Sequence, residues 1–197
     1  MGKTKTKAKY RTLATILIMS LLALIIIAIY LYFSNRTEPL VDPSVENMSE
    51  IERLLDQDLD LYYPETPREV TKLFSRMLKV LYDTDTKQDE LEVIALKIRD
   101  LYDDEFLTSN PEDTYLTGLY TDIATWKEAG RRITNFIVAD EDANQISEID
   151  GVNYAIVNVS FTIQENGKFI EKWEVMLRQG KDKKWKILGW KTISNNK

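Results

Sequence analysis

The sequence contains neither cysteine nor histidine. Without cysteine there can be no disulfide bonds, thiol nucleophiles, cysteine-ligated zinc, iron–sulfur clusters or lipid attachment through a thiol. Without histidine the chain lacks the commonest general base and the commonest ligand of transition metals. A secreted eukaryotic domain of this size usually carries disulfides, so the composition is more typical of a bacterial protein. We expect no cofactor and no metal centre.

Positive charge is concentrated at the start of the chain. Five basic residues occur among the first eleven, with no acidic residue between them: Lys3, Lys5, Lys7, Lys9 and Arg11. The net charge of the whole chain is −6, so the part that follows is more acidic than this total. Phosphates repel an acidic domain, and we therefore expect no nucleic-acid partner. The basic segment suits the anionic inner leaflet of a membrane instead.

One long segment, residues 12–33, contains no charged side chain. A helix of about 20 apolar residues crosses the hydrocarbon core of a bilayer. Tyr30 and Tyr32 stand at one end, where amphipathic rings favour the interface. No small-residue cleavage pattern follows, which favours an uncleaved anchor over a signal peptide. The preceding basic residues predict a single-pass protein of the cell membrane, with its N-terminus in the cytoplasm and residues 34–197 outside the cell.

The chain is predicted to begin with a basic tail (residues 1–11) and a membrane helix (residues 12–33). An acidic stalk over residues 34–63 then leads to a domain over residues 64–194. Pro39 and Pro43 interrupt helix formation within the stalk. Ser49-Glu50-Ile51-Glu52 matches a capping box and predicts a short helix near residues 50–57. This helix is interpreted as a membrane-proximal spacer or as a docking strip for a partner.

Residues 64–194 are predicted to be an α+β domain. Three helices are expected: one from the Thr66-Pro67-Arg68-Glu69 start signal to about Tyr82, one after Thr86, and one from the Asn110-Pro111 signal to Gly130. Beyond Gly130 the apolar period changes to two, which predicts four antiparallel strands near residues 133–139, 152–164, 169–177 and 184–193. Asp150-Gly151 and Asn166-Gly167 mark tight turns. The helices are expected to pack on one face of the sheet.

This order of elements resembles the nuclear transport factor 2-like fold, a cone of helices wrapped by a curved antiparallel sheet. Three segments, Tyr63–Val70, Trp126–Arg131 and Trp185–Trp190, also resemble an uncharacterised family of small membrane-anchored proteins from clostridia-like Gram-positive bacteria. The resemblance implies a fold and a location. It implies no reaction, because the family has no assigned activity.

Folds of this kind often hold an apolar pocket between sheet and helices, although aromatic rings are also ordinary core residues. A carboxylate can act as a base beside a tyrosine hydroxyl that donates to an oxyanion, and Asp122, or Glu174 opposite a tyrosine, is a candidate for that carboxylate. Neither residue lies in a motif, and we expect no catalytic residue. The candidate pocket-lining residues are Tyr115, Leu119, Asp122, Trp126, Tyr154, Trp173 and Trp185.

A lysine-rich segment precedes the last predicted strand. Lys181, Lys183, Lys184 and Lys186 surround Trp185. The favoured interpretation is a charged hairpin tip that discourages other chains from pairing with the edge strand. Contact with anionic lipid or wall polymer is the alternative.

The leading functional hypothesis is a membrane-anchored extracytoplasmic scaffold or assembly subunit of an envelope complex, with a protein partner and no catalysis. Its architecture is similar to that of the bitopic assembly factors of type IV secretion and conjugation systems, an analogy of architecture alone. One alternative is an extracytoplasmic module that binds a small ligand in an aromatic pocket. The other, which we regard as the weakest, is an isomerase- or dehydratase-type enzyme.

Overall fold

The computed structural model describes Met19, residues 48–140 and residues 145–193. The chain divides into two units, residues 1–47 and residues 48–197, and the second contains nearly all of the described residues. The predicted tail (1–11), the predicted membrane segment (12–33, apart from Met19) and stalk residues 34–47 lie outside the described part. Within the described part, no helix has the length and apolar character needed to cross a membrane.

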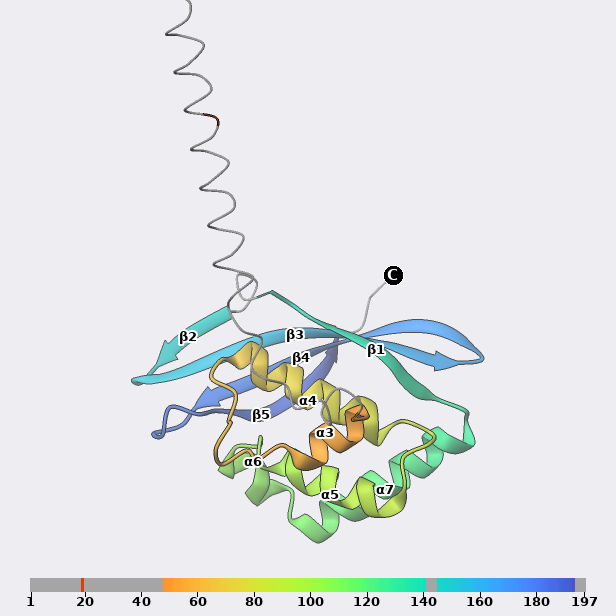
Figure 1. Cartoon of the computed structure of the whole chain (residues 1–197). Coiled ribbons are helices and arrows are strands. Elements are labelled where there is room, and N and C mark those ends of the chain that lie inside the picture. Colours follow the sequence, from red (N-terminus) through yellow and green to blue (C-terminus); the bar gives the residue numbers. More distant parts are fainter. Residues whose placement is uncertain (1–18, 20–47, 141–144, 194–197) are drawn as a thin grey trace, which may run out of the picture. The chain divides into compact units, whose positions relative to one another are not determined.

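The unit from residue 48 onward has an α+β architecture, with helices first and strands second, as predicted (Figure 1). Its described helices are α3 (Glu50–Asp56), α4 (Pro67–Leu81), α5 (Gln88–Arg99), α6 (Asp104–Ser109) and α7 (Glu112–Glu128). Its described strands are β1 (Arg132–Val138), β2 (Gln145–Ile149), β3 (Val152–Glu165), β4 (Gly167–Gln179) and β5 (Trp185–Ile193).

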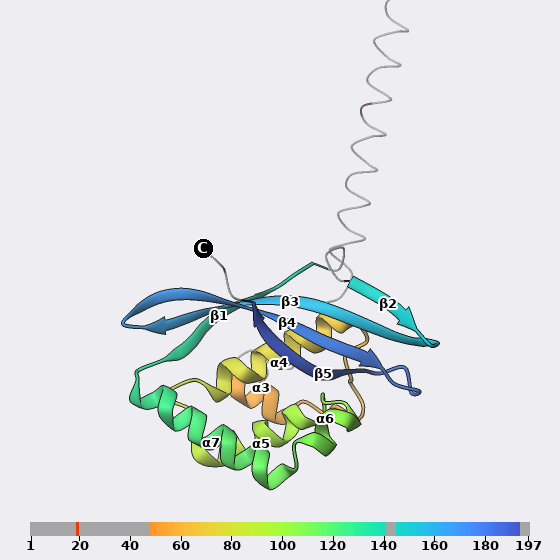
Figure 2. The ribbon, with the colours of Figure 1, turned by 180° about the vertical axis from the view of Figure 1, so that it is seen from behind.

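The five described strands form one curved antiparallel sheet in the order β1-β3-β4-β5, and β2 pairs with β3 (Figure 2). One side of β3 pairs with β4, and its other side pairs with β1 and β2 along different stretches. The two predicted turns are confirmed, with positive φ at Asp150 and Gly151 and at Asn166. The prediction of four strands was wrong, because β2 was missed. All five β2 residues are exposed, so no buried face produces the alternating pattern that marks a strand.

Helix α4 is the centre of the core. It begins with the predicted capping box, in which Thr66 accepts from the Glu69 backbone N–H and Glu69 accepts from the Thr66 backbone N–H. Val70, Phe74 and Met77 are fully buried and lie at the i, i+4 and i+7 positions of one helix face. Helix α4 packs against β1, β3 and β5 of the sheet and against α5. The inward residues of β3 complete this core: Ala155, Val157, Val159, Phe161 and Ile163.

The short helix α3 belongs to the compact unit. Its predicted capping box between Ser49 and Glu52 is present. Leu54 is fully buried, and the ammonium of Lys97 in α5 donates to the carbonyl oxygens of Leu54 (3.0 Å), Gln57 (2.8 Å) and Leu55. A lysine at the end of a helix satisfies carbonyl groups that have no partner within the helix. The compact unit therefore begins at Met48, earlier than the predicted domain boundary at residue 64.

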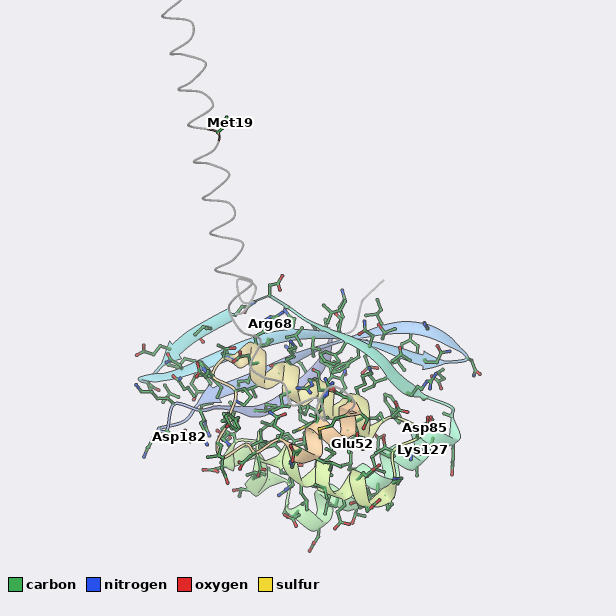
Figure 3. All side chains as sticks on the ribbon, viewed as in Figure 1. Met19, Glu52, Arg68, Asp85, Lys127 and Asp182 are labelled. Atoms are coloured by element: carbon green, nitrogen blue, oxygen red, sulfur yellow. The ribbon has the colours of Figure 1, made fainter. Side chains whose placement is uncertain are left out.

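The described helices α3 to α7 lie on one face of the sheet, as Figures 1 and 2 show from opposite sides. Helix α7 leads from this layer into β1. Figure 3 places Lys127 near Asp85, where the Lys127 ammonium reaches the Thr86 carbonyl oxygen at 3.5 Å and connects α7 to the loop before α5. The opposite face of the sheet carries no described helix.

Candidate functional site

One face of helix α7 carries four of the predicted pocket residues. Tyr115, Leu119, Asp122 and Trp126 follow one another at helical spacing, and Tyr115, Leu119 and Trp126 pack against the hydrophobic core. The Tyr115 ring lies 6.0 Å from the Tyr102 ring, at nearly a right angle. These three side chains stay partly exposed, and the buried residue of α7 is Ile123.

Tyr82 joins the C-terminal half of α7 to α4. Its ring is 4.4 Å from the Trp126 ring, and its hydroxyl donates to Oδ2 of Asp122 at 2.5 Å. Burial, followed by the hydrogen bond to Asp122, raises the pKa of Tyr82. The phenol therefore stays protonated at neutral pH and acts as a donor to the carboxylate. Because Asp122 itself is solvent-exposed, this pair has the geometry of a structural tether.

Trp173 anchors the sheet side of the same region. It stacks nearly parallel on Trp190 of β5, with centroids 5.8 Å apart, and meets Phe161 edge-on at 4.9 Å. Its indole Nε1–H donates to Glu171 at 2.6 Å. Glu171 also pairs with Arg131 at 3.3 Å, so the tryptophan and the arginine share one carboxylate.

Arg131 connects the sheet to α7. Its guanidinium lies over the Trp126 ring at 4.2 Å and near the Phe169 ring at 5.3 Å, an arrangement that favours cation–π attraction. Ring contacts form two groups, Tyr82 with Trp126, and Tyr102 with Tyr115, Trp190 and Trp173. Arg131 joins the two groups, because it lies over the Trp126 ring and shares Glu171 with Trp173. We call these six rings the aromatic cluster. Burial raises the pKa of Tyr115 to about 12, and burial also raises the pKa of Tyr102 well above its ordinary value, so both hydroxyls are protonated at physiological pH.

The remaining predicted residues lie elsewhere. Trp185 is buried at the start of β5, and its carbonyl oxygen accepts a hydrogen bond from the Tyr63 hydroxyl at 2.8 Å. Tyr154 lies opposite Arg178 in the sheet and lines a separate cavity of about 590 Å³. Glu174 was expected to lie opposite a tyrosine, and this expectation was wrong. Its neighbours are Asn158 and Lys191, and it pairs with Lys191 at 2.6 Å.

Sequence reasoning missed three contributors to this region. Tyr82 comes just after the end of α4, and Tyr102 comes shortly after the end of α5. An aromatic residue at the end of a helical pattern is easily assigned to the apolar face of that helix. Arg131 follows Gly130, just beyond the C-terminal end of α7, where a basic residue is ordinarily explained by the favourable interaction of its charge with the helix end. The signal available for Arg131 was its position between the last tryptophan of the helix and the first strand.

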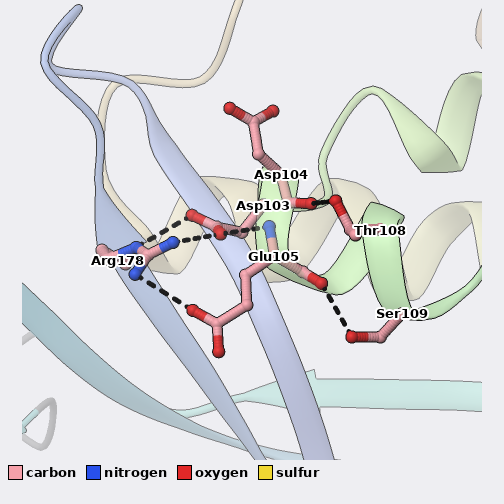
Figure 4. A network of polar contacts seen from close by, with 6 residues as sticks. All are labelled: Asp103, Asp104, Glu105, Thr108, Ser109 and Arg178. Carbon is pink, nitrogen blue, oxygen red and sulfur yellow. Dashed lines mark hydrogen bonds and ion pairs between the residues drawn. The ribbon is translucent and has the colours of Figure 1, made fainter.

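A second network fixes the unpredicted helix α6 to the sheet (Figure 4). Arg178 of β4 donates to both carboxylate oxygens of Asp103, from Nε to Oδ2 at 3.0 Å and from Nη2 to Oδ1. Its Nη1 also donates to Oε2 of Glu105 at 3.3 Å. Asp103 is buried and caps α6 by accepting from the Glu105 backbone N–H. The hydrogen bonds that Arg178 donates to Asp103 raise the pKa of Arg178 further above its ordinary value, so the guanidinium keeps its charge.

A family described as a domain of unknown function, DUF6715, matches residues 1–190. The chain belongs to the DUF6715 family. No curated protein matches it. The prediction of an uncharacterised family is thereby confirmed, and the matched DUF6715 region covers residues 12–33 as well as the α+β unit up to residue 190. It also contains Trp126, Arg131 and Trp190, which come from two of the three segments that carried the resemblance. Arg131 lies over the Trp126 ring, and Trp190 stacks on Trp173.

Proposed function

We propose that this protein is a membrane-anchored extracytoplasmic scaffold or assembly subunit, with a nuclear transport factor 2-like domain that presents the outer face of its sheet to a protein partner. The outer face is the side that no described helix covers. The proposal also takes residues 12–33 as the anchor, because they contain no charged side chain and follow a basic tail.

The exposed apolar side chains of the outer face carry this proposal. Ile137 of β1 is 67% exposed, and Ile170 and Met176 of β4 are 61% and 46% exposed. Pairing across the sheet places Met176 directly opposite Ile156, while Ile170 lies opposite Thr162. Single exposed apolar residues are normal, but apolar residues spread over an uncovered sheet face are typical of interaction surfaces.

Polar side chains separate these apolar positions. Glu174 and Lys191 form an ion pair at 2.6 Å on the outer face, in the row between Met176 and Lys172. A mixture of apolar side chains and paired charges is typical of interfaces that form after the subunit has folded. The composition of this face therefore favours a partner that binds the folded domain.

The test is affinity purification of the tagged full-length protein from its own membranes in mild detergent, with mass spectrometry of what copurifies. The double variant Ile170→Lys with Met176→Lys places two charges on the outer face. Val93→Lys is the matched control, since Val93 is 43% exposed on helix α5, on the other side of the sheet. We expect a stoichiometric partner with the unmodified protein and with the control, and its loss with the double variant. A protein that purifies alone would refute the scaffold proposal.

A specific observation favours one second candidate, an extracytoplasmic ligand-binding module. The aromatic cluster combines ring faces, neutral tyrosine donors and the Arg131 cation, and Trp190 and Phe169 remain 37% and 40% exposed. Binding of a small aromatic molecule there would quench tryptophan fluorescence. Trp190→Phe should then weaken the binding, whereas an unchanged affinity would remove this candidate.

A further inference from the structure

A small polar cavity lies beside β5, the last strand of the sheet. Its volume is about 310 Å³, at the lower end of the range of small-molecule sites. We call it the β5-edge cavity. Five charged side chains and one tyrosine that line it carry the argument: Asp60, Asp100, Asp104, Lys184, Lys186 and Tyr63. A sixth charged side chain of the lining, Arg99, is paired with Glu112 at 3.9 Å.

Backbone hydrogen bonds hold the walls of this cavity in place. The segment between α5 and α6 pairs with β5, since the Ile187 N–H donates to the Leu101 carbonyl oxygen at 2.8 Å and the Asp103 N–H donates to the Ile187 carbonyl oxygen at 2.9 Å. This pairing brings Asp100 and Asp104, one at each end of the segment, close to Lys186. On the opposite wall, the Tyr63 hydroxyl is fixed on the Trp185 carbonyl oxygen.

The charges of the cavity are not paired with one another. Among the described residues, none of the five charged side chains comes within 4 Å of an opposite charge. The Lys186 ammonium donates to the Asp100 carbonyl oxygen at 2.5 Å and lies 4.6 Å from the centre of the Tyr63 ring. The Lys184 ammonium lies 4.9 Å from the same ring, so two like charges share one aromatic ring.

Both signs of charge are disfavoured at this place. Burial raises the pKa of Asp100, and burial followed by the charge of Lys184 lowers the pKa of Lys186. Each shift opposes the ionised form, which shows that neither group is fully compensated by its neighbours. A molecule that brings a cation to the aspartates and an anion to the lysines would offset both costs.

We propose that the β5-edge cavity binds a small zwitterion, a molecule with one ammonium and one carboxylate group such as a free amino acid or a dipeptide. The carboxylate meets Lys184 and Lys186, and the ammonium meets the carboxylates of Asp60, Asp100 and Asp104. The three aspartates disfavour a simple anion, and the two lysines disfavour a simple cation. Leu59 and Leu107 add a limited apolar surface for a short side chain.

This proposal is independent of the proposed scaffold function. The cavity is built from the α5–α6 segment, the loop before α4 and the start of β5, whereas the scaffold proposal rests on Ile137, Ile170 and Met176. Failure to find a protein partner would leave the cavity untouched, and failure to bind a zwitterion would leave the outer face untouched.

The experiment is saturation-transfer NMR and calorimetry on the full-length protein in detergent. Glycine, L-leucine and glycylglycine are the zwitterionic probes, and acetate and methylammonium are the single-charge probes. At least one zwitterion should bind at least about tenfold more tightly than either single-charge probe, since loss of a charge-assisted hydrogen bond costs about this factor or more.

Two variants and two matched controls locate the binding. Lys186→Met and Asp100→Asn should each weaken zwitterion binding at least about tenfold. Lys172→Met on β4 and Asp113→Asn on α7 remove the same charges from exposed positions outside the cavity and should leave the affinity unchanged. Circular dichroism would check that each variant folds. Absence of binding by all three zwitterions, equal binding of acetate, or equal affinity in the variants and the controls would each overturn the proposal.

Discussion

The ion pair between Arg178 and Asp103 provides the clearest test of how α6 is held against the sheet. The change is Arg178→Met, which keeps much of the side-chain volume and removes the guanidinium. Asp103 then loses its bidentate partner but still caps α6, because the Glu105 backbone N–H donates to it at 3.0 Å. The variant therefore isolates the ionic contact from the helix cap.

The expected cost follows from the burial of the two side chains. The Asp103 side chain is 8% exposed and the Arg178 side chain is 28% exposed. Removal of one partner from a buried ion pair costs about 3–5 kcal/mol, because the other charge stays buried without compensation. The partial exposure of Arg178 lets water reach the site, so we take the lower end, about 3 kcal/mol. This is a large share of the total stability of a small domain.

The assay is urea unfolding of residues 48–197, followed by circular dichroism, in a double-mutant cycle with Asp103→Asn. We expect Arg178→Met to cost about 3 kcal/mol and Asp103→Asn about 2 kcal/mol, with the double variant less destabilised than their sum by about 1.5 kcal/mol. Lys172→Met, on the same strand and exposed, should stay within about 0.5 kcal/mol of the unmodified domain. A cost below about 1 kcal/mol for Arg178→Met, or strictly additive costs, would refute the reasoning.

Three further predictions concern the start of the domain and the β5-edge cavity. Leu54→Ala should destabilise residues 48–197 by about 3 kcal/mol in the same assay, because Leu54 is fully buried, and a cost near zero would show that α3 is dispensable. Thr66→Ala should cost about 1 kcal/mol by removing the side-chain oxygen that accepts from the Glu69 N–H, with Thr66→Ser as the control that keeps it. Asp100→Asn should raise the melting temperature at pH 7. Burial raises the pKa of Asp100 in the folded state above its ordinary value of 3.8, so the ionised carboxylate destabilises the fold at neutral pH. The gain in melting temperature should therefore disappear as the pH falls to 3.8.

The sequence predicted those elements whose periodicity is produced by burial. Helix α4 and strand β3 were predicted nearly to the residue, because their buried side chains recur at helical and alternating spacing. Helix α6 and strand β2 were missed for a common reason. Neither contains a buried residue, and both are held by contacts to distant parts of the chain, α6 by Arg178 of β4 and β2 by pairing with β3.

The site was predictable only on the α7 side. Spacing alone places Tyr115, Asp122 and Trp126 on one face of a helix, and the structure keeps them there. Which residues meet that face depends on tertiary packing, so Tyr82 and Arg131 had no sequence signal as partners of Trp126. Tyr154 failed as a pocket residue because it alternates with the buried Ala155 and Val157, so it lies on the other face of β3 from the core.

The way the sheet ends explains why the proposed scaffold surface is a face and not an edge. An unpaired edge strand offers its backbone N–H and C=O groups to any other chain. On β5 both the N–H and the C=O of Ile187 are already used by the α5–α6 segment. Arg178 and Asp103 hold that segment in place with a buried ion pair, so freeing the edge would cost several kcal/mol. A partner that added a strand at β5 would have to displace this contact, whereas one that binds the outer face displaces only water. Loss of the Arg178–Asp103 pair should therefore expose β5 to non-specific strand pairing. Arg178→Met should show a greater tendency to self-associate than the unmodified protein and than Lys172→Gln, which removes a charge from β4 without adding an apolar side chain, in analytical ultracentrifugation.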